Sequence, residues 1–127
     1  MENTPRGELT VCTVAMPADA NPSGDIFGGW ILSQMDIAGG VAAARRARGR
    51  CATVAVKEMT FHLPVQIGDL VSCYADIVRI GRTSLTVNIQ AWATPHFEPA
   101  PPQMVTEGTF TYVAIDADRK PRPVPPP

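Results

Sequence analysis

The sequence of 127 residues predicts an α+β fold in which one long helix packs against an antiparallel sheet. Three observations support this prediction. One helical periodicity follows a first strand-like segment, four strand-like segments then come in succession, and no strand–helix–strand alternation indicates a parallel sheet. Because one helix covers only one face of a sheet, we expect the other face or an edge to contact another subunit.

The first strand is expected over residues 8–16, where β-branched residues are frequent. Turn-forming residues fill 17–24 and indicate a loop. The helix is expected to begin near Phe27 or Gly28 and to end near Arg48, since apolar residues recur there with helical spacing.

Three glycines qualify the helix prediction. Gly49 is a natural stop signal at the carboxyl end. Gly39 and Gly40 lie inside the helix, where each glycine costs about 1 kcal/mol relative to alanine. We therefore expect another element to approach the helix closely at this pair.

Four strands are expected after the helix, over residues 51–63, 70–80, 83–93 and 104–115. In the first, the apolar parity switches between Val56 and Met59, which predicts a bulge. The second and third flank Gly81 and Arg82 and are typical of a hairpin. The third alternates cleanly, with one face formed by Leu85, Val87, Ile89 and Ala91.

Composition and charge bound the domain organisation and exclude several classes of function. We expect one domain over 1–118 and a disordered, proline-rich tail over 119–127. The net charge of −1 offers no basic field for nucleic acid or an anionic membrane, and the longest apolar region is broken by polar residues and glycines. The three cysteines are far apart, and no segment resembles a signal peptide, so a cytoplasmic location is expected without disulfides. No clustered ligand spacing indicates a metal.

The segment from Asn21 to Asp36, NPSGDIFGGWILSQMD, carries the strongest functional signal. A helix that opens at Gly28 and Gly29 exposes backbone N–H groups beside positive dipole charge, and such a start can hold a developing oxyanion. Asp36 lies about two turns further along, where a carboxylate can act as base or nucleophile at the same centre. The residues therefore predict a site that attacks a carbonyl group.

The sequence GDIFGGWILSQMD, followed by TVAVKEMTF, P-x-x-x-GD and IGRTS, resembles acyl-CoA thioesterases of the YciA type over residues 9–118. The resemblance implies the hotdog fold, a curved antiparallel sheet wrapped round a central helix. It implies hydrolysis of an acyl-CoA to a free acid and CoA, with no separate cofactor. It also implies homodimers joined through a continuous sheet, with active sites at the interface and further assembly into tetramers or hexamers.

The resemblance also implies roles for individual residues. Gly28 would polarise the thioester carbonyl through its N–H, and Asp36 would activate water or attack directly. Asn21 would help to place water or substrate, and Thr53 is the nearest match to an assisting hydroxyl. The predicted substrate and CoA contacts are Phe27, Gly29, Gly81, Arg82, Thr83 and Ser84.

Two other functions stay open at this point. A non-catalytic acyl-CoA-binding module of the same fold is one, although such sensors resemble fusions with a DNA-binding element for which the residues before the first strand leave no room. A hydratase acting on acyl thioesters is the other, although that chemistry pairs an acid with a histidine at the helix start. His62 and His96 lie elsewhere and are expected to be structural, and no G-x-S-x-G motif indicates a serine hydrolase.

Overall fold

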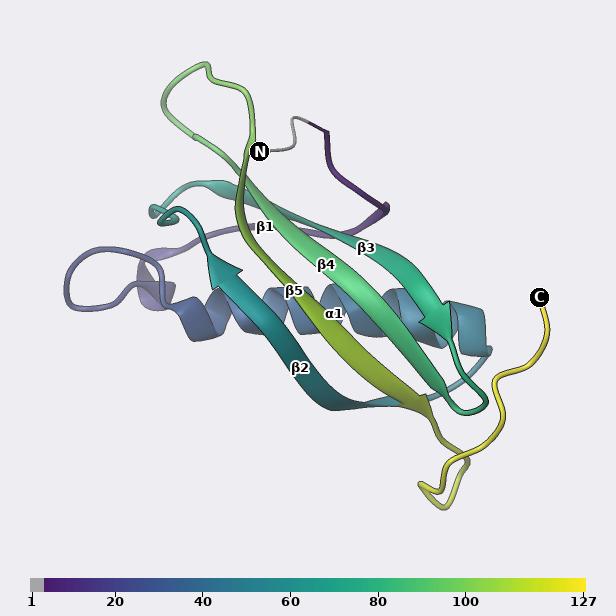
Figure 1. The fold of residues 1–127 in the computed structure, drawn as a ribbon. Coiled ribbons are helices and arrows are strands. Elements are labelled where there is room, and N and C mark those ends of the chain that lie inside the picture. The colour runs from purple at the N-terminus through teal and green to yellow at the C-terminus, as the bar shows by residue number, and fades with distance from the viewer. Residues whose placement is uncertain (1–3) are drawn as a thin grey trace.

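One helix and one sheet form two layers in the computed structural model, which describes residues 4–127 (Figure 1). Helix α1, Gly28–Ala47, lies across one face of a five-stranded sheet whose paired strands are all antiparallel. The strands are β1 Glu8–Val14, β2 Cys51–Phe61, β3 Leu70–Ile80, β4 Ser84–Thr94 and β5 Gln103–Ala114. A short 3₁₀ helix, η1 Pro17–Asp19, precedes α1. The predicted fold class is confirmed.

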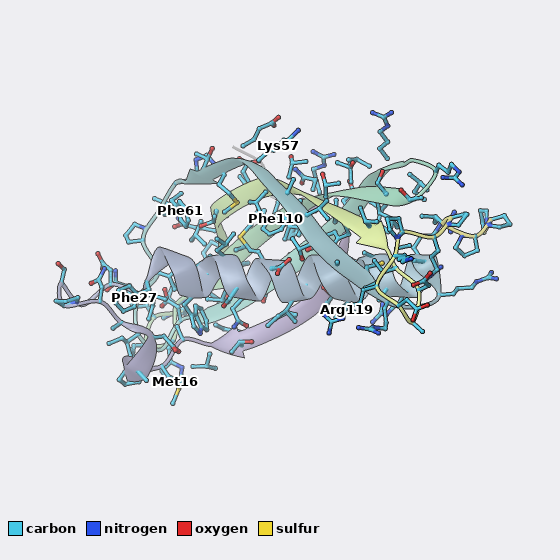
Figure 2. The ribbon with its side chains drawn as sticks, turned by 90° about the horizontal axis from the view of Figure 1, so that it is seen from below. Met16, Phe27, Lys57, Phe61, Phe110 and Arg119 are labelled. Atoms are coloured by element: carbon cyan, nitrogen blue, oxygen red, sulfur yellow. The ribbon has the colours of Figure 1, made fainter. Side chains whose placement is uncertain are left out.

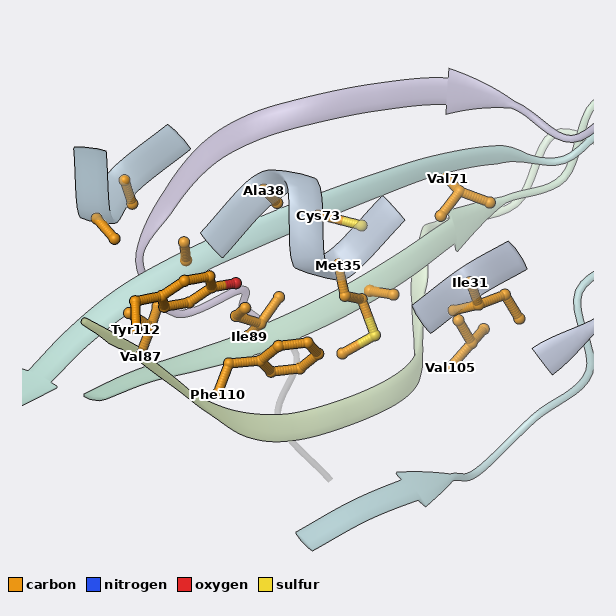
Figure 3. Packing of buried hydrophobic residues seen from close by; sticks show 14 of the residues in the cluster. Ile31, Met35, Ala38, Val71, Cys73, Val87, Ile89, Val105, Phe110 and Tyr112 are labelled. Atoms are coloured by element: carbon orange, nitrogen blue, oxygen red, sulfur yellow. The ribbon is translucent and has the colours of Figure 1, made fainter. Parts of the chain in front are cut away.

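The strand order is β1-β3-β4-β5-β2, so β1 and β2 form the two edges. The inward face of β4 is the alternating set of the sequence, since Leu85, Val87, Ile89 and Ala91 are fully buried. Figure 3 shows part of this core, where Met35 and Ile89 pack with Phe110 between the helix and the sheet. Among residues 4–127, no helix is long and apolar enough to cross a membrane.

The predicted bulge in β2 is confirmed. The pairing with β5 shifts register between Lys57 and Thr60, and Glu58 takes a left-handed φ of 56°. A bulge bends its strand and increases the local twist. β2 therefore curves round the helix and brings Phe61 close to the start of α1 (Figure 2).

The helix ends near Arg48, as predicted. Its last residue is Ala47, and Arg48 is the cap, with a left-handed φ of 54°. Gly49 follows the cap, so the left-handed position is taken by Arg48 and not by the glycine. A Cβ at Gly49 would lie 2.6 Å from a guanidinium nitrogen of Arg122, which packs against this end of the helix.

The carboxyl-terminal segment 119–127 packs along the helix end and the sheet. Arg122 donates to the carbonyl of Ala47 through Nη2 and to that of Ile115 through Nε, each at 3.0 Å. The Val124 N–H donates to the Arg82 carbonyl at 2.8 Å. The ordered tail differs from the disorder that the proline-rich composition predicts. Arg122 accounts for the difference, because it donates to the Ala47 carbonyl at the end of the helix and to the Ile115 carbonyl after β5.

Candidate active site

A carboxylate held by two hydroxyls lies between the middle of α1 and two strands. Asp36 Oδ1 accepts a hydrogen bond from Thr53 Oγ1 at 2.7 Å and another from Tyr112 Oη at 3.0 Å. Thr53 on β2 and Tyr112 on β5 are direct cross-strand partners, so their side chains leave the same face of the sheet. Asp36 Oδ2 has no donor among residues 4–127 and is the oxygen left for a reaction.

The hydroxyl of Tyr112 reaches Asp36 through a space in the helix at Gly39. A Cβ at Gly39 would overlap the Tyr112 hydroxyl and Ile89 Cδ1, and it would lie 2.9 Å from Tyr112 Cζ. A Cβ at Gly40 would meet only a Tyr112 ring carbon at 3.9 Å, which is ordinary contact. The close approach predicted for the glycine pair is therefore confirmed for Gly39, and Gly40 plays no such part.

The environment of Tyr112 keeps its hydroxyl neutral. The side chain is buried, with 1 % of the residue exposed. Burial raises the pKa of the Tyr112 hydroxyl far above its usual value, and the charge of Asp36 and the hydrogen bond to it add to the rise. Tyr112 therefore stays a hydrogen-bond donor at every pH at which the protein would work.

A separate pocket of about 310 Å³ opens at the start of α1. It is lined by Asn21, Asp25, Ile26, Gly28, Ile31, Phe61, His62, Leu63, Pro64 and Val65. The N–H groups of Gly28 and Gly29 are the first donors of the helix and have no acceptor among residues 4–127. A Cβ at Gly28 would lie 3.3 Å from the ring of Phe61, which is tighter than an ordinary contact. Glycine at this position therefore leaves the N–H groups at the helix start accessible from the pocket. Phe27, which precedes it, is half exposed.

Asn21 lines the same pocket, and its side chain also organises the loop. Its Oδ1 accepts from the N–H of Ser23 at 2.9 Å and from that of Asp25 at 3.2 Å. These bonds form an Asx-type turn that fixes the approach to the helix. Only the amide NH₂ group of Asn21 is left to contact a ligand.

One protomer does not bring Gly28 and Asp36 to one centre. Eight residues of helix separate them, which corresponds to about 12 Å of rise, whereas reacting atoms must come within about 3.5 Å. Helical N–H groups also point toward the amino terminus, so the free donor of Gly28 points away from Asp36. The single centre predicted from the residues alone is therefore wrong for an isolated protomer.

The predicted phosphate-contacting turn lies between β3 and β4, at the opposite end of α1 from the pocket (Figure 1). The N–H of Gly81 donates to the Ser84 carbonyl at 2.8 Å and closes the turn. The Arg82 side chain is exposed. The Arg82 carbonyl accepts a hydrogen bond from the N–H of Val124 in the tail, and the Thr83 carbonyl accepts one from the N–H of Ala114 at 2.9 Å. The turn is thus fixed on both sides and presents a guanidinium that has no ion-pair partner among residues 4–127.

Two residues of these sites were not predicted from the sequence. His62 lies at the pocket and pairs with Glu107, with Nε2 and Oε2 2.7 Å apart. Tyr112 was assigned only to a strand, although its parity with Phe110 and Ala114 placed its hydroxyl on the buried face, where it needs a partner. No group of three or more metal-ligating side chains occurs among residues 4–127.

Comparisons with known proteins agree with this architecture. Residues 23–99 match the thioesterase superfamily. The acyl-CoA thioester hydrolase YciA of Salmonella typhimurium is 53 % identical over 127 residues, covering 98 % of this chain and 96 % of that protein. The YciA protein of Escherichia coli is 50 % identical, covering 97 % of this chain and 95 % of that protein.

Solved structures show the same fold. HI0827, described as a hexameric broad-specificity acyl-coenzyme A thioesterase, superposes with a TM-score of 0.92 and 42 % identity as an aspartate-to-alanine mutant, covering 94 % of this chain and 88 % of that one. The hexameric thioesterase y2039 of Yersinia pestis gives 0.91 and 49 %, covering 97 % and 99 % of the two chains. The hexameric hotdog-fold thioesterase Cj0915 of Campylobacter jejuni gives 0.87 and 40 %, covering 94 % and 91 %. These superpositions confirm the predicted hotdog fold.

Proposed function

The chain belongs to the thioesterase superfamily and is an acyl-CoA thioester hydrolase, and from this premise we propose that Asp36 supplies the catalytic carboxylate. One observation carries the assignment. Asp36 is a half-buried carboxylate with one oxygen fixed by Thr53 and Tyr112 and the other without a donor among residues 4–127. A carboxylate in this state can accept a proton or attack a carbonyl without first losing a protein partner.

The reaction consumes water and releases an acid and a thiol. As general base, Asp36 takes a proton from water while the water oxygen bonds to the thioester carbonyl carbon. As nucleophile, Asp36 forms a mixed anhydride that water then cleaves. In both routes the carbon–sulfur bond breaks, the thiolate of CoA leaves and takes up a proton, and the acyl group departs as a carboxylic acid.

The N–H of Gly28 stabilises the oxyanion that forms on the carbonyl oxygen, with Gly29 beside it. Both groups lie at the positive end of the helix dipole and are free of acceptors among residues 4–127. Asn21 helps to place water or substrate through its free amide group, and Phe27 contacts the acyl part at the half-exposed start of the helix. Thr53 acts through its hydrogen bond to Asp36.

A complete site requires two copies of the chain, because Gly28 and Asp36 of one protomer are about 12 Å apart along the helix. The edge strand β2 offers a surface for a second copy. It has unpaired backbone groups on its outer side and exposes Val54, Val56 and Phe61, which are 57 %, 41 % and 51 % exposed. We therefore propose a homodimer as the minimal unit, joined through β2, which assembles further into a hexamer as its solved relatives do.

The turn of Gly81, Arg82, Thr83 and Ser84 binds the phosphates of CoA. Backbone groups close the turn, and Arg82 supplies an exposed guanidinium suited to phosphate oxygens. CoA enters and leaves as part of substrate and product, so no separate cofactor takes part.

Release of free CoA thiol from a panel of acyl-CoAs, short to long, tests the assignment of Asp36. Asp36→Asn should lose turnover, while Asp118→Asn, which removes an exposed carboxylate elsewhere, should keep the wild-type rate. A folded Asp36→Asn protein with wild-type turnover would refute the assignment. Tight CoA binding without turnover by the wild-type protein would instead support a non-catalytic acyl-CoA-binding module.

Mixed oligomers test whether the site spans two protomers. Gly28→Pro removes the N–H at a first helical position that tolerates proline, and Phe27 already has the extended conformation, with φ −56° and ψ 134°, that precedes proline. Gly28→Ala keeps the N–H and serves as the control for the added Cβ. Co-expressed Gly28→Pro and Asp36→Asn chains should recover about a quarter of wild-type activity, since half of randomly formed dimers are mixed and each has one intact site. No recovery from chains shown to mix would argue for a site within one protomer.

A further inference from the structure

We propose that Tyr112 is a positioning residue that fixes the carboxylate of Asp36 and selects which of its oxygens reacts, and that Gly39 exists to admit the Tyr112 hydroxyl. The proposal rests on the assignment of Asp36 as the catalytic carboxylate. It concerns two residues that do not touch the substrate, one in the last strand and one in the middle of the helix.

The two oxygens of Asp36 have different hydrogen-bond partners. Thr53 donates to Oδ1 at 2.7 Å, and the single O–H proton of Tyr112 is shared between Oδ1 and the Asp36 backbone carbonyl, each 3.0 Å away. An oxygen that accepts one full and one shared hydroxyl donor is a poorer proton acceptor than a neighbour that accepts none. The proton of the attacking water, or the new bond to carbon, therefore goes to Oδ2.

Tyr112 is the more rigidly held of the two hydroxyl donors to Asp36. Thr53 is exposed on an edge strand, whereas Tyr112 is buried and stacks on Phe110 at an interplanar angle of 11° (Figure 3). The Tyr112 hydroxyl also lies 3.0 Å from the backbone carbonyl of Asp36, so it contacts the same residue at two points. A buried ring held in this way determines where the carboxylate lies relative to the helix axis.

Gly39 has no side chain, and this leaves room for the Tyr112 hydroxyl. An added Cβ would overlap the Tyr112 hydroxyl, so any other residue at this position would push the hydroxyl away from Asp36. Glycine inside a helix lowers helix stability. The neighbouring Gly40 has room for a methyl group, so the close approach is specific to Gly39, where Ile89 Cδ1 and the Tyr112 hydroxyl share the space.

The groups that face Asp36 from the strands are two hydroxyls, that of Thr53 from β2 and that of Tyr112 from β5. No ion pair with Asp36 occurs among residues 4–127. The position of the carboxylate therefore depends on these two hydrogen bonds, and removal of one leaves the other hydroxyl alone to hold it.

Tyr112→Phe tests the proposal, and Tyr74→Phe is a matched control because Tyr74 and Tyr112 are the two tyrosines of the chain. Tyr112→Phe should lower kcat roughly ten- to a hundred-fold, as expected for a lost hydrogen bond to a charged group, while KM stays within about twofold. Tyr74→Phe should change neither quantity.

A kcat for Tyr112→Phe equal to that of Tyr74→Phe would overturn the proposal. If Asp36→Asn is inactive in the same assay, that outcome leaves the proposed function intact and removes only the role of Tyr112. If Asp36→Asn is fully active, the assignment of Asp36 fails first. The two failures are therefore distinguishable.

A second measurement does not depend on activity and covers the case in which Tyr112→Phe folds poorly. In the Tyr74→Phe background, ring-fluorinated tyrosine labels Tyr112 alone. Its fluorine NMR resonance should differ clearly between the protein with Asp36 and the Asp36→Asn variant, and Asp118→Asn should leave it unchanged. A resonance that is the same in all three proteins would refute the contact on which the proposal depends.

Discussion

The glycine pair in α1 allows the space for Tyr112 to be tested by adding one methyl group at a time. Gly39→Ala places a Cβ against the Tyr112 hydroxyl and Ile89 Cδ1, whereas Gly40→Ala places it 3.9 Å from the nearest atom, a Tyr112 ring carbon. The two substitutions are chemically identical and one residue apart in the same helix. Their difference therefore reports the contacts that a Cβ at Gly39 makes with Tyr112 and Ile89.

The magnitude follows from two opposing effects. Each alanine gains about 1 kcal/mol of helix propensity over glycine, and this gain cancels when the two variants are compared. Overpacking at Gly39 costs about 1–3 kcal/mol, and no such cost applies at Gly40. Gly40→Ala should therefore raise the free energy of unfolding by up to about 1 kcal/mol, and Gly39→Ala should lie about 1–3 kcal/mol below Gly40→Ala.

Urea unfolding and thiol release measure the two consequences. Unfolding should be followed at one fixed protomer concentration, because assembly makes the apparent stability depend on concentration. In the activity assay, Gly39→Ala should lose kcat by roughly the same factor as Tyr112→Phe, and the double variant should lose little more, since both changes remove one contact. Gly40→Ala should keep the wild-type kcat.

Equal stability and equal kcat for Gly39→Ala and Gly40→Ala would refute the reasoning. Additive losses of kcat in the Gly39→Ala, Tyr112→Phe double variant would show that Gly39 acts on the reaction by another route. Either result would remove the contact with Tyr112 as the explanation of the helix glycine.

Three further predictions follow from other parts of the molecule. Arg82→Ala should raise KM for acyl-CoA roughly two- to tenfold with little change in kcat, and the effect should shrink as salt is added because the exposed guanidinium is screened. An unchanged KM at low salt would show that Arg82 is not part of the CoA site. Burial, with the nearby Asp36, raises the pKa of Tyr112, so the stability that Tyr112 contributes is complete below about pH 10, the usual tyrosine value, and is lost as pH rises further. Near-ultraviolet absorbance of Tyr74→Phe should therefore show no tyrosine ionisation until the protein unfolds, and a normal tyrosine titration of the folded protein would contradict this. Arg122→Ala should lower the free energy of unfolding by about 1–2 kcal/mol through the lost bonds to Ala47 and Ile115, and an unchanged urea midpoint would show that the tail adds no stability.

Local sequence patterns predicted most of the elements and their limits. The alternation of Leu85, Val87, Ile89 and Ala91 identified the inward face of β4, and the parity switch before Met59 identified the bulge in β2. The helix began at Gly28 as expected. These features depend on residues within one or two turns of each other, which is the range over which periodicity and turn chemistry act.

The same patterns predicted Gly28 and Asp36 as functional residues but not their arrangement. A motif of sixteen residues placed both on one helix, and the helix rise then separates them by about 12 Å. Asn21 was predicted for its amide, yet half of that group is used to shape its own loop. Chemistry that depends on a second copy of the chain cannot be worked out from one helix alone.

By itself, the sequence determined the α+β class, the limits of the helix and strands, and the segment that carries the carboxylate and the glycine donors. Only the tertiary structure decided that Tyr112, 76 residues away from Asp36, holds the carboxylate through a gap at Gly39, and that Arg122 packs the tail on the helix end. The physical reason is the distance along the sequence over which each kind of interaction acts. Hydrophobic periodicity is local, whereas a hydrogen bond between a helix and the last strand depends on the register of β2 against β5 and on the distance between two layers, which the fold as a whole fixes.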